Sequence, residues 1–386
     1  MNDMVSRRAL SIFPALCLAL ALWLRPFDVV AQVPQGVFTL SAADKVAQQS
    51  ALDNRDVVGL SIRAGWAALE PSEGVFNWSY LDSEIARATA AGKVVMLRIS
   101  TQSGKPQWVT DAIKQAGGKF FNYDNNGETG SFALYWDPTF LAKKKAMIAA
   151  VGARYGGNPN IKIVSASFAN GTSEDWSVPH ETADVTQWLS LGYTTDKLVD
   201  AGKQMIDAVM TAFPNAYVTV AMNGNGYTGK GPNLDPDSNY VPRTVTANAN
   251  ASWPGRFIAQ KNSLSTFNPV APGTNSNWEV LWNNRPNVGA QMLYWCANET
   301  SYRMNGGVPG DPATVLRKAI DAGLSYGLSF LEIYQTDVIN LPGEIAYAHG
   351  KLVGQPPTPP TPTPSASPTP PPAGAPAPPV GLRVVK

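Results

Sequence analysis

The chain has 386 residues, of which 44% are hydrophobic and 15% charged, so it holds enough apolar material for a sizeable core and is not disordered throughout. Thirty Lys and Arg against 29 Asp and Glu give a formal net charge of +1, which removes the broad basic surface that a nucleic-acid binder needs. Two histidines and two cysteines are too few for a zinc site built on these residues and disfavour a Ser-His-Asp triad, so we expect no metal or cofactor and a chemistry that rests on carboxylates.

The first 31 residues have the pattern of an export signal. Arg7 and Arg8 precede an apolar run over residues 9–24, and small residues at 29–31 offer a cleavage site. An uncleaved membrane anchor is the alternative, but Pro14 interrupts the run, which falls short of the ~20 residues that a spanning helix needs. We expect a secreted or periplasmic protein with no membrane insertion after signal cleavage. The paired arginines also resemble a twin-arginine signal, although general secretion fits comparably.

Short β-rich runs alternate with segments of helical periodicity over the middle of the chain, which indicates parallel strands joined by crossover helices. Helices are expected to begin at a capping box at Ser79, at Asp137-Pro138, at Thr195 and at Asp311-Pro312. We predict eight strands, at residues 37–40, 57–66, 93–100, 161–170, 216–223, 256–262, 288–295 and 328–334.

Residues 32–354 therefore predict one α/β domain, a (β/α)8 TIM barrel. Eight such units over about 320 residues fit that fold with loop insertions, since the plain fold takes ~250 residues. The longest insertions, 103–136 and 224–253, follow strands, so we expect long loops at the C-terminal face, where barrels build their active sites. An open doubly wound sheet is the alternative; the lack of an early G-x-G-x-x-G turn disfavours it weakly.

The end of the chain changes composition. Residues 355–379 are rich in Pro and Thr and cannot form a core, so we expect an extended tail or linker there. Only a stub of residues 380–386 follows, which is too short to fold alone.

The most informative segment spans residues 59–82. It combines a strand with Trp66, then Leu69-Glu70-Pro71, Glu73-Gly74, Trp78 and Leu81-Asp82 before a helix. This pattern resembles the second strand and loop of retaining glycoside hydrolase barrels, including the beta-galactosidases of family 42, and the resemblance continues through the third strand. The alternative interpretation is that the same residues only brace a loop and a helix. The resemblance implies two carboxylates, an acid after the fourth strand and a nucleophile after the seventh.

Glu174 is the candidate acid/base. It follows the fourth expected strand and lies near Trp176, whose apolar ring disfavours ionisation, as a general acid requires. The usual Asn-Glu pair is absent, because Asn170 and Glu174 are separated by three residues. A plain loop carboxylate is the alternative, and Asp175 is the nearest rival for the role.

Glu332 is the candidate nucleophile. An acidic residue inside an otherwise apolar strand is costly to bury unless it is paired or functional. Tyr334 lies on the same face two residues later and could hold Glu332. The structural alternative is an ion pair between Glu332 and a barrel arginine, Arg63 or Arg98.

One departure from the family concerns the strand count. Glu332 lies on the eighth expected strand, whereas the seventh carries Gln291, which can neither attack nor titrate. The count is off by one, the base has moved, or the barrel binds glycans without cleaving them. Polar and aromatic residues near strand ends would converge at the mouth and suit sugar recognition, or they satisfy barrel backbone groups and pack. The candidates are Arg63, Trp66, Arg98, Asn170, Trp176, Asn223, Gln260, Asn262, Gln291, Tyr294 and Tyr334.

The sequence thus predicts an exported glycoside hydrolase that acts on a neutral oligo- or polysaccharide with retention. Glu174 would protonate the leaving oxygen, Glu332 would attack the anomeric carbon, and Glu174 would then activate water. A catalytically inactive carbohydrate-binding barrel is the main alternative, motivated by Gln291 and by the missing Asn-Glu pair.

Overall fold

The computed structural model of the protein describes residues 33–125, 128–168, 178–179, 182–223, 234–272, 276–298 and 301–354. In this part of the chain, eight parallel strands close into a barrel in the order β1-β10-β9-β8-β7-β6-β3-β2. The strands are β1 (Gly36–Leu40), β2 (Val57–Gly65), β3 (Val94–Ser100), β6 (Ile161–Ser165), β7 (Tyr217–Ala221), β8 (Phe257–Leu264), β9 (Val288–Met292) and β10 (Phe330–Tyr334). The predicted (β/α)8 barrel is confirmed, and each predicted strand is present.

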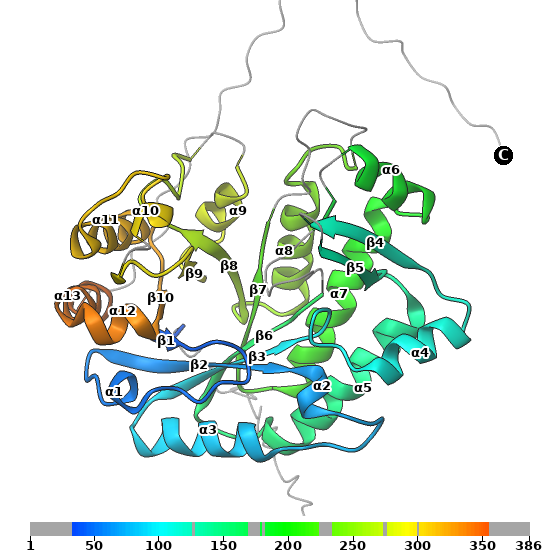
Figure 1. The fold of residues 1–386 in the computed structure, drawn as a ribbon, viewed down its shortest axis with the longest axis horizontal. Helices are drawn as coiled ribbons and strands as arrows, with labels where there is room; N and C mark the ends of the chain where they lie inside the picture. The colour runs from blue at the N-terminus through cyan, green and yellow to red at the C-terminus, as the bar shows by residue number, and fades with distance from the viewer. Residues whose placement is uncertain are drawn as a thin grey trace, which may run out of the picture. The chain divides into compact units, whose positions relative to one another are not determined.

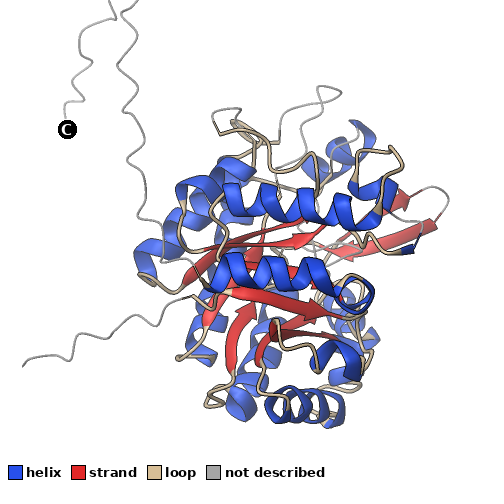
Figure 2. Ribbon diagram, turned by 90° about the vertical axis from the view of Figure 1, so that its left-hand side faces the viewer, coloured by secondary structure: helices blue, strands red, loops and turns tan. Residues whose placement is uncertain are grey.

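Helices connect the strands and cover the outside of the barrel (Figures 1 and 2). The longer ones bury apolar stripes against the strands, as helical periodicity requires. Their bounds are α1 (Gln49–Leu52), α2 (Trp66–Leu69), α3 (Ser79–Ala90), α4 (Gln107–Gln115), α5 (Pro138–Tyr155), α6 (Thr182–Ser190), α7 (Thr195–Ala212), α8 (Tyr240–Ser252), α9 (Trp278–Asn283), α10 (Ser301–Met304), α11 (Pro312–Ser325), α12 (Gln335–Asn340) and α13 (Pro342–Val353). None of the helices described is long and apolar enough to cross a membrane.

The predicted helix starts are confirmed where a side chain caps the helix. Asp137 accepts the backbone N–H of Phe140 at 2.9 Å, and Asp311 accepts that of Thr314 at 2.9 Å. The capping box expected at Ser79 is wrong, because no side-chain cap forms at the start of α3. Asp82 instead accepts hydrogen bonds from Arg154 and Tyr155 of α5, so tertiary contacts replace the local cap.

The two insertions expected as long loops hold regular structure. Residues 103–136 contain α4 and an antiparallel hairpin of β4 (Phe120–Asn125) and β5 (Glu128–Ala133). The hairpin packs through Phe121 against Trp188 of α6, with ring centroids 5.1 Å apart. Within the insertion 224–253, residues 240–252 form the crossover helix α8. The aromatic residues of the first insertion therefore serve packing as well as any role at the mouth.

The lower barrel interior is apolar. Phe38, Met96, Ile163, Tyr217, Ile258 and Phe330 form a buried cluster there, separate from the core between barrel and helices. Phe38 and Phe330 meet edge to face with ring centroids 5.5 Å apart. Gly59 and Gly289 make room for these rings, since a Cβ at either glycine would lie within 2.3 Å of a ring atom. The layer closes the barrel below the polar residues described next.

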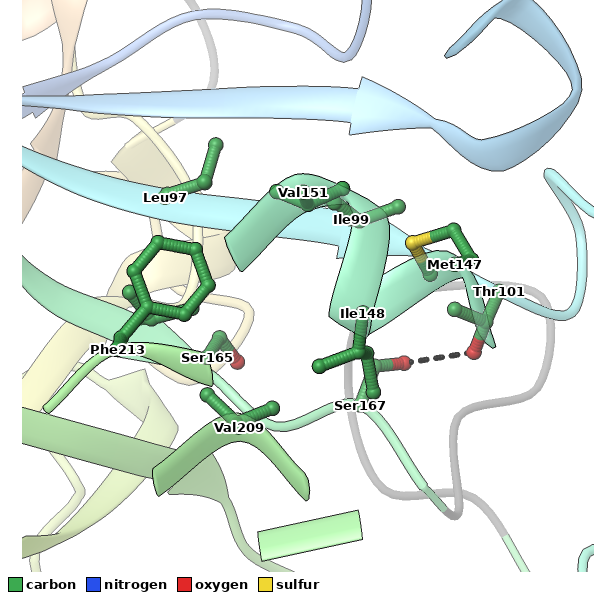
Figure 3. Close-up of a pocket in the computed structure, with 11 residues that line it drawn as sticks. Leu97, Ile99, Thr101, Met147, Ile148, Val151, Ser165, Ser167, Val209 and Phe213 are labelled. Carbon is green, nitrogen blue, oxygen red and sulfur yellow. Dashed lines mark hydrogen bonds between the residues drawn. The ribbon is translucent and has the colours of Figure 1, made fainter. Parts of the chain in front are cut away.

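A small cavity of about 20 Å³ lies outside the barrel, between β3 and β6 on one side and α5 and α7 on the other (Figure 3). Its lining is mostly aliphatic, with Leu97, Met147 and Val209 among the walls. At one edge the hydroxyls of Thr101 and Ser167 are hydrogen-bonded at 3.0 Å. The cavity is a gap in helix-to-barrel packing and not the mouth of the barrel.

Candidate active site

A polar layer lies above the apolar layer of the barrel. Residues two positions along a strand share a face, so the next inward positions are Arg98 after Met96, Gln260 after Ile258, and Glu332 after Phe330. Gln291 follows Gly289 in the same way and pairs with Glu332 in the strand register. Four strands far apart in sequence thus bring one cation, one carboxylate and two amides together.

Glu332 is the centre of this layer. Its side chain is 0% exposed, and Oε2 accepts hydrogen bonds from Arg98 and from Gln260. Arg98 is 3% exposed, so the two form a buried ion pair. The second oxygen, Oε1, is buried and has no hydrogen-bond partner among the described residues. One carboxylate oxygen is therefore held, and the other is unsatisfied.

Hydrogen bonds extend the layer in two directions. Arg98 also donates to Gln291 Oε1 at 2.9 Å, and Gln291 donates through its amide nitrogen to the hydroxyl of Tyr334 at 3.1 Å. Gln260 donates to Asn262 at 3.0 Å and accepts from Thr219 at 3.1 Å. These partners fix both amide orientations, because each amide carries a donor and an acceptor with distinct partners. Thr219 belongs to the network although it was not predicted.

The strand count is now settled. Glu332 lies on β10, the eighth barrel strand in chain order, and Gln291 lies on β9, the seventh. The alternative that the strand count made from the sequence was off by one is therefore excluded. The alternative of an ion pair between Glu332 and a barrel arginine is confirmed for Arg98.

The remaining predicted residues divide into two groups. Arg63 is half-buried on β2, next to Arg98 in the register, and donates to the carbonyl of Ser41 at 3.3 Å. Asn223 is exposed after β7 and accepts from Asn277 at 2.8 Å and from Lys261. These contacts are made to groups outside the network around Glu332.

Trp66 does not reach the mouth. It is 0% exposed in α2, and its indole nitrogen donates to Glu70 Oε2 at 2.7 Å. Glu70 in turn accepts the backbone N–H of Gly74 at 2.8 Å. A fully buried ring that braces the following loop has no exposed face, so its burial does not support the prediction that Trp66 binds substrate. Glu174, Asn170, Trp176 and Asp175 lie outside the described residues.

Aromatic side chains stand beside the polar layer. Tyr294 and Trp295, which follow β9, stack with ring centroids 3.7 Å apart, and Trp295 meets Tyr334 edge to face at 5.5 Å. Arg303 covers Tyr294 at 4.4 Å from the ring centroid. All three rings are partly buried. Sugar rings pack well on such faces.

A second buried carboxylate, Asp337, was missed from the sequence. It is 0% exposed in α12 and accepts backbone N–H groups from Cys296 and Ala297. Burial raises the pKa of Asp337 to about 6, although the two amides act in the opposite direction. Its position three residues after Tyr334 was the available signal. Among the described residues no group of three or more His, Cys, Asp or Glu could hold a metal ion.

Comparison with known proteins gives the same family that the motif indicates. The family model of glycoside hydrolase family 42, beta-galactosidase, matches residues 43–202. Beta-galactosidase BbgII of Bifidobacterium bifidum is 25% identical over 221 residues, which are 54% of this chain and 30% of that protein. A beta-galactosidase of Thermus thermophilus is 30% identical over 108 residues, which are 26% of this chain and 16% of that protein. This chain thus spans less than a third of either relative.

Solved structures share the fold. A beta-galactosidase from the psychrophilic Marinomonas ef1 superimposes with a TM-score of 0.51 at 12% identity, over 77% of this chain and 53% of that one. The catalytic domain of beta-amylase from Paenibacillus polymyxa gives a TM-score of 0.54 at 11% identity, over 83% of this chain and 99% of that one. At such identities the likeness establishes the barrel fold alone. The resemblance to barrel glycoside hydrolases is nevertheless confirmed through the family match.

Proposed function

We propose that this chain is a glycoside hydrolase that cleaves β-galactosides. The observation that carries the proposal is the carboxylate of Glu332, held at Oε2 by Arg98 and Gln260 with Oε1 unsatisfied. A buried acidic residue with an unpaired oxygen is expensive, and such cost is typical of functional sites. The family match over residues 43–202 and the beta-galactosidase relatives support the substrate class.

The proposed mechanism uses two carboxylates with retention. Glu332 Oε1 attacks the anomeric carbon while Glu174 gives its proton to the leaving oxygen, and Glu174 then takes a proton from the water that releases the sugar. Arg98 holds the orientation of Glu332 and supplies the positive charge that a buried carboxylate needs. Tyr334, Gln291 and Asn262 are suited to bind sugar hydroxyls.

The test is hydrolysis of para-nitrophenyl glycosides of galactose, glucose, xylose and mannose, and of neutral polysaccharides. We expect turnover of the β-galactoside and a drop in kcat of roughly 10²–10⁴-fold in Glu174→Gln, the usual contribution of general acid-base catalysis. Glu332→Gln should lose at least as much. Glu73→Gln is the matched control, because this glutamate is 60% exposed and paired with Lys143 on the surface. Proton NMR of the first product should show the β-anomer.

A catalytically inactive carbohydrate-binding barrel is the second candidate. Complete burial of Glu332 in an ion pair and the presence of Gln291 on the seventh strand favour it. Binding of lactose without hydrolysis of any glycoside would support this candidate. Turnover that survives Glu332→Gln would instead keep the enzyme and move the nucleophile to another residue.

A further inference from the structure

Three aromatic side chains, Tyr294, Trp295 and Tyr334, form what we call the aromatic wall. Each keeps part of its surface exposed where the seventh and eighth strands end. Tyr334 accepts a hydrogen bond from Gln291, which itself accepts one from Arg98. The wall is therefore joined by two hydrogen bonds to the arginine that holds Glu332.

The backbone that carries half of this wall is tied down by Asp337. The two carboxylate oxygens accept the N–H of Cys296 at 2.9 and 2.8 Å, and one of them also accepts the N–H of Ala297 at 2.6 Å. These two amides directly follow Trp295. Asp337 thus fixes the peptide units from which the Trp295 ring projects, and it links the loop after β9 to α12.

Holding the loop through Asp337 carries the desolvation cost of a buried carboxylate. Asp337 is fully buried, no cation among the described residues contributes to its pKa, and burial raises that pKa. An uncompensated buried carboxylate is strongly unfavourable, and its hydrogen bonds offset only part of that desolvation penalty. A role in stability alone would be served as well by a neutral side chain. The geometry of the loop is what three charge-assisted bonds secure.

We propose that Asp337 is a positioning residue, which orients Trp295 so that its ring, within the aromatic wall, packs against the apolar C–H face of a galactoside ring. The proposal rests on the proposed function for the identity of its ligand. Asp337 itself touches no sugar and acts through the loop. It follows that ligand affinity, rather than the rate of the chemical step, depends on the Asp337 carboxylate.

The experiment compares the parent with Asp337→Asn, Trp295→Ala and the control Asp311→Asn. Asp311 also accepts a backbone amide, but at the start of α11, so it matches the chemistry outside the wall. Readouts are KM and kcat for para-nitrophenyl β-galactoside, and the dissociation constant of lactose from tryptophan emission. We expect Asp337→Asn and Trp295→Ala to raise KM and the lactose constant about tenfold, which is about 1.4 kcal/mol, with kcat much less affected. Asp311→Asn should match the parent.

The outcomes separate this inference from the proposed function. Unchanged KM and lactose affinity in folded Asp337→Asn would overturn the inference. A fall in kcat that only matches the fall in the folded fraction of the variant would overturn it as well. If the parent binds lactose without hydrolysing any glycoside, weaker binding by Asp337→Asn still supports it. If Asp337→Asn does not fold, unchanged affinity in Trp295→Ala overturns it. If the parent neither hydrolyses a glycoside nor binds lactose, both proposals are overturned.

Discussion

The stability of the barrel interior depends on the buried ion pair between Arg98 and Glu332. Arg98→Met leaves Glu332 buried without its cation, and breaking a buried pair in this way costs about 3–5 kcal/mol. We expect a loss of that size in the free energy of unfolding, measured by urea denaturation. The double variant Arg98→Met/Glu332→Leu should recover much of it, because no charge is then left unpaired.

A matched control is available on the surface. Arg154 pairs with Asp82, but the two side chains are 42% and 41% exposed, so Arg154→Met should cost less than about 1 kcal/mol. If Arg98→Met were as mild as Arg154→Met, the pair would be solvated in solution and the buried site described above would be incorrect.

Lys144 gives the fold a pH dependence at the residue scale. Its side chain is buried in α5, its amine donates to the carbonyl of Ser167, and burial lowers its pKa to about 7. Between pH 7 and its unfolded value of about 10.4, the unfolded chain binds a proton that the folded chain does not, so stability rises with pH in this window.

We therefore expect the parent to gain stability over Lys144→Met by up to about 1.4 kcal/mol per pH unit as the pH rises above 7. Urea unfolding at pH 6, 7, 8 and 9 measures the difference, in which groups common to both proteins cancel. Lys145→Met, which removes the exposed neighbouring amine, should show no such slope. A constant difference between parent and Lys144→Met would mean that this amine stays charged in the fold.

At the scale of elements, β9 depends on Gly289. A Cβ there would lie 2.1 Å from the ring of Phe330, which belongs to the buried apolar layer. Gly289→Ala should therefore lower the free energy of unfolding by about 1–3 kcal/mol, the usual cost of overpacking. Thermal or urea unfolding measures it, and a smaller ring neighbour in Gly289→Ala/Phe330→Leu should relieve the clash.

Gly343→Ala is the control for that prediction. It lies near the start of α13 with nothing within 4 Å of the new Cβ, so the change should be neutral or slightly stabilising. Equal effects at positions 289 and 343 would show that the clash with the Phe330 ring contributes no cost.

Local sequence decided the elements where it also supplied their caps. Asp137-Pro138 and Asp311-Pro312 place α5 and α11 correctly, because the cap is made by residues within the same turn. The predicted capping box at Ser79 was wrong because Asp82 accepts hydrogen bonds from Arg154 and Tyr155, which lie 72 and 73 residues away. The same competition made two expected loops into a hairpin and a helix.

At the scale of the whole molecule, export remains a prediction. Residues 1–31 should be removed when the chain is expressed in a bacterium. The intact mass of the exported protein should therefore be that of a chain that begins at Gln32. A twin-arginine route would make export fail in Arg7→Lys/Arg8→Lys, with Arg25→Lys as control, whereas general secretion tolerates these changes, since Lys keeps the positive charge. An uncleaved N-terminus in the exported fraction would contradict the signal.

Strand and helix periodicity and helix caps are local properties that repeat along the chain, so the amino-acid sequence was enough to predict the barrel. It also singled out Glu332 as a costly acidic residue in an apolar strand. The partners of Glu332 could not be predicted in this way, because Arg98 lies 234 residues earlier and meets it through closure of the barrel. The same closure joined Gln291 to Tyr334, buried Trp66 away from the mouth, and brought Asp337 beneath the loop of Trp295. Contacts between distant strands depend on register and shear, which no local pattern encodes.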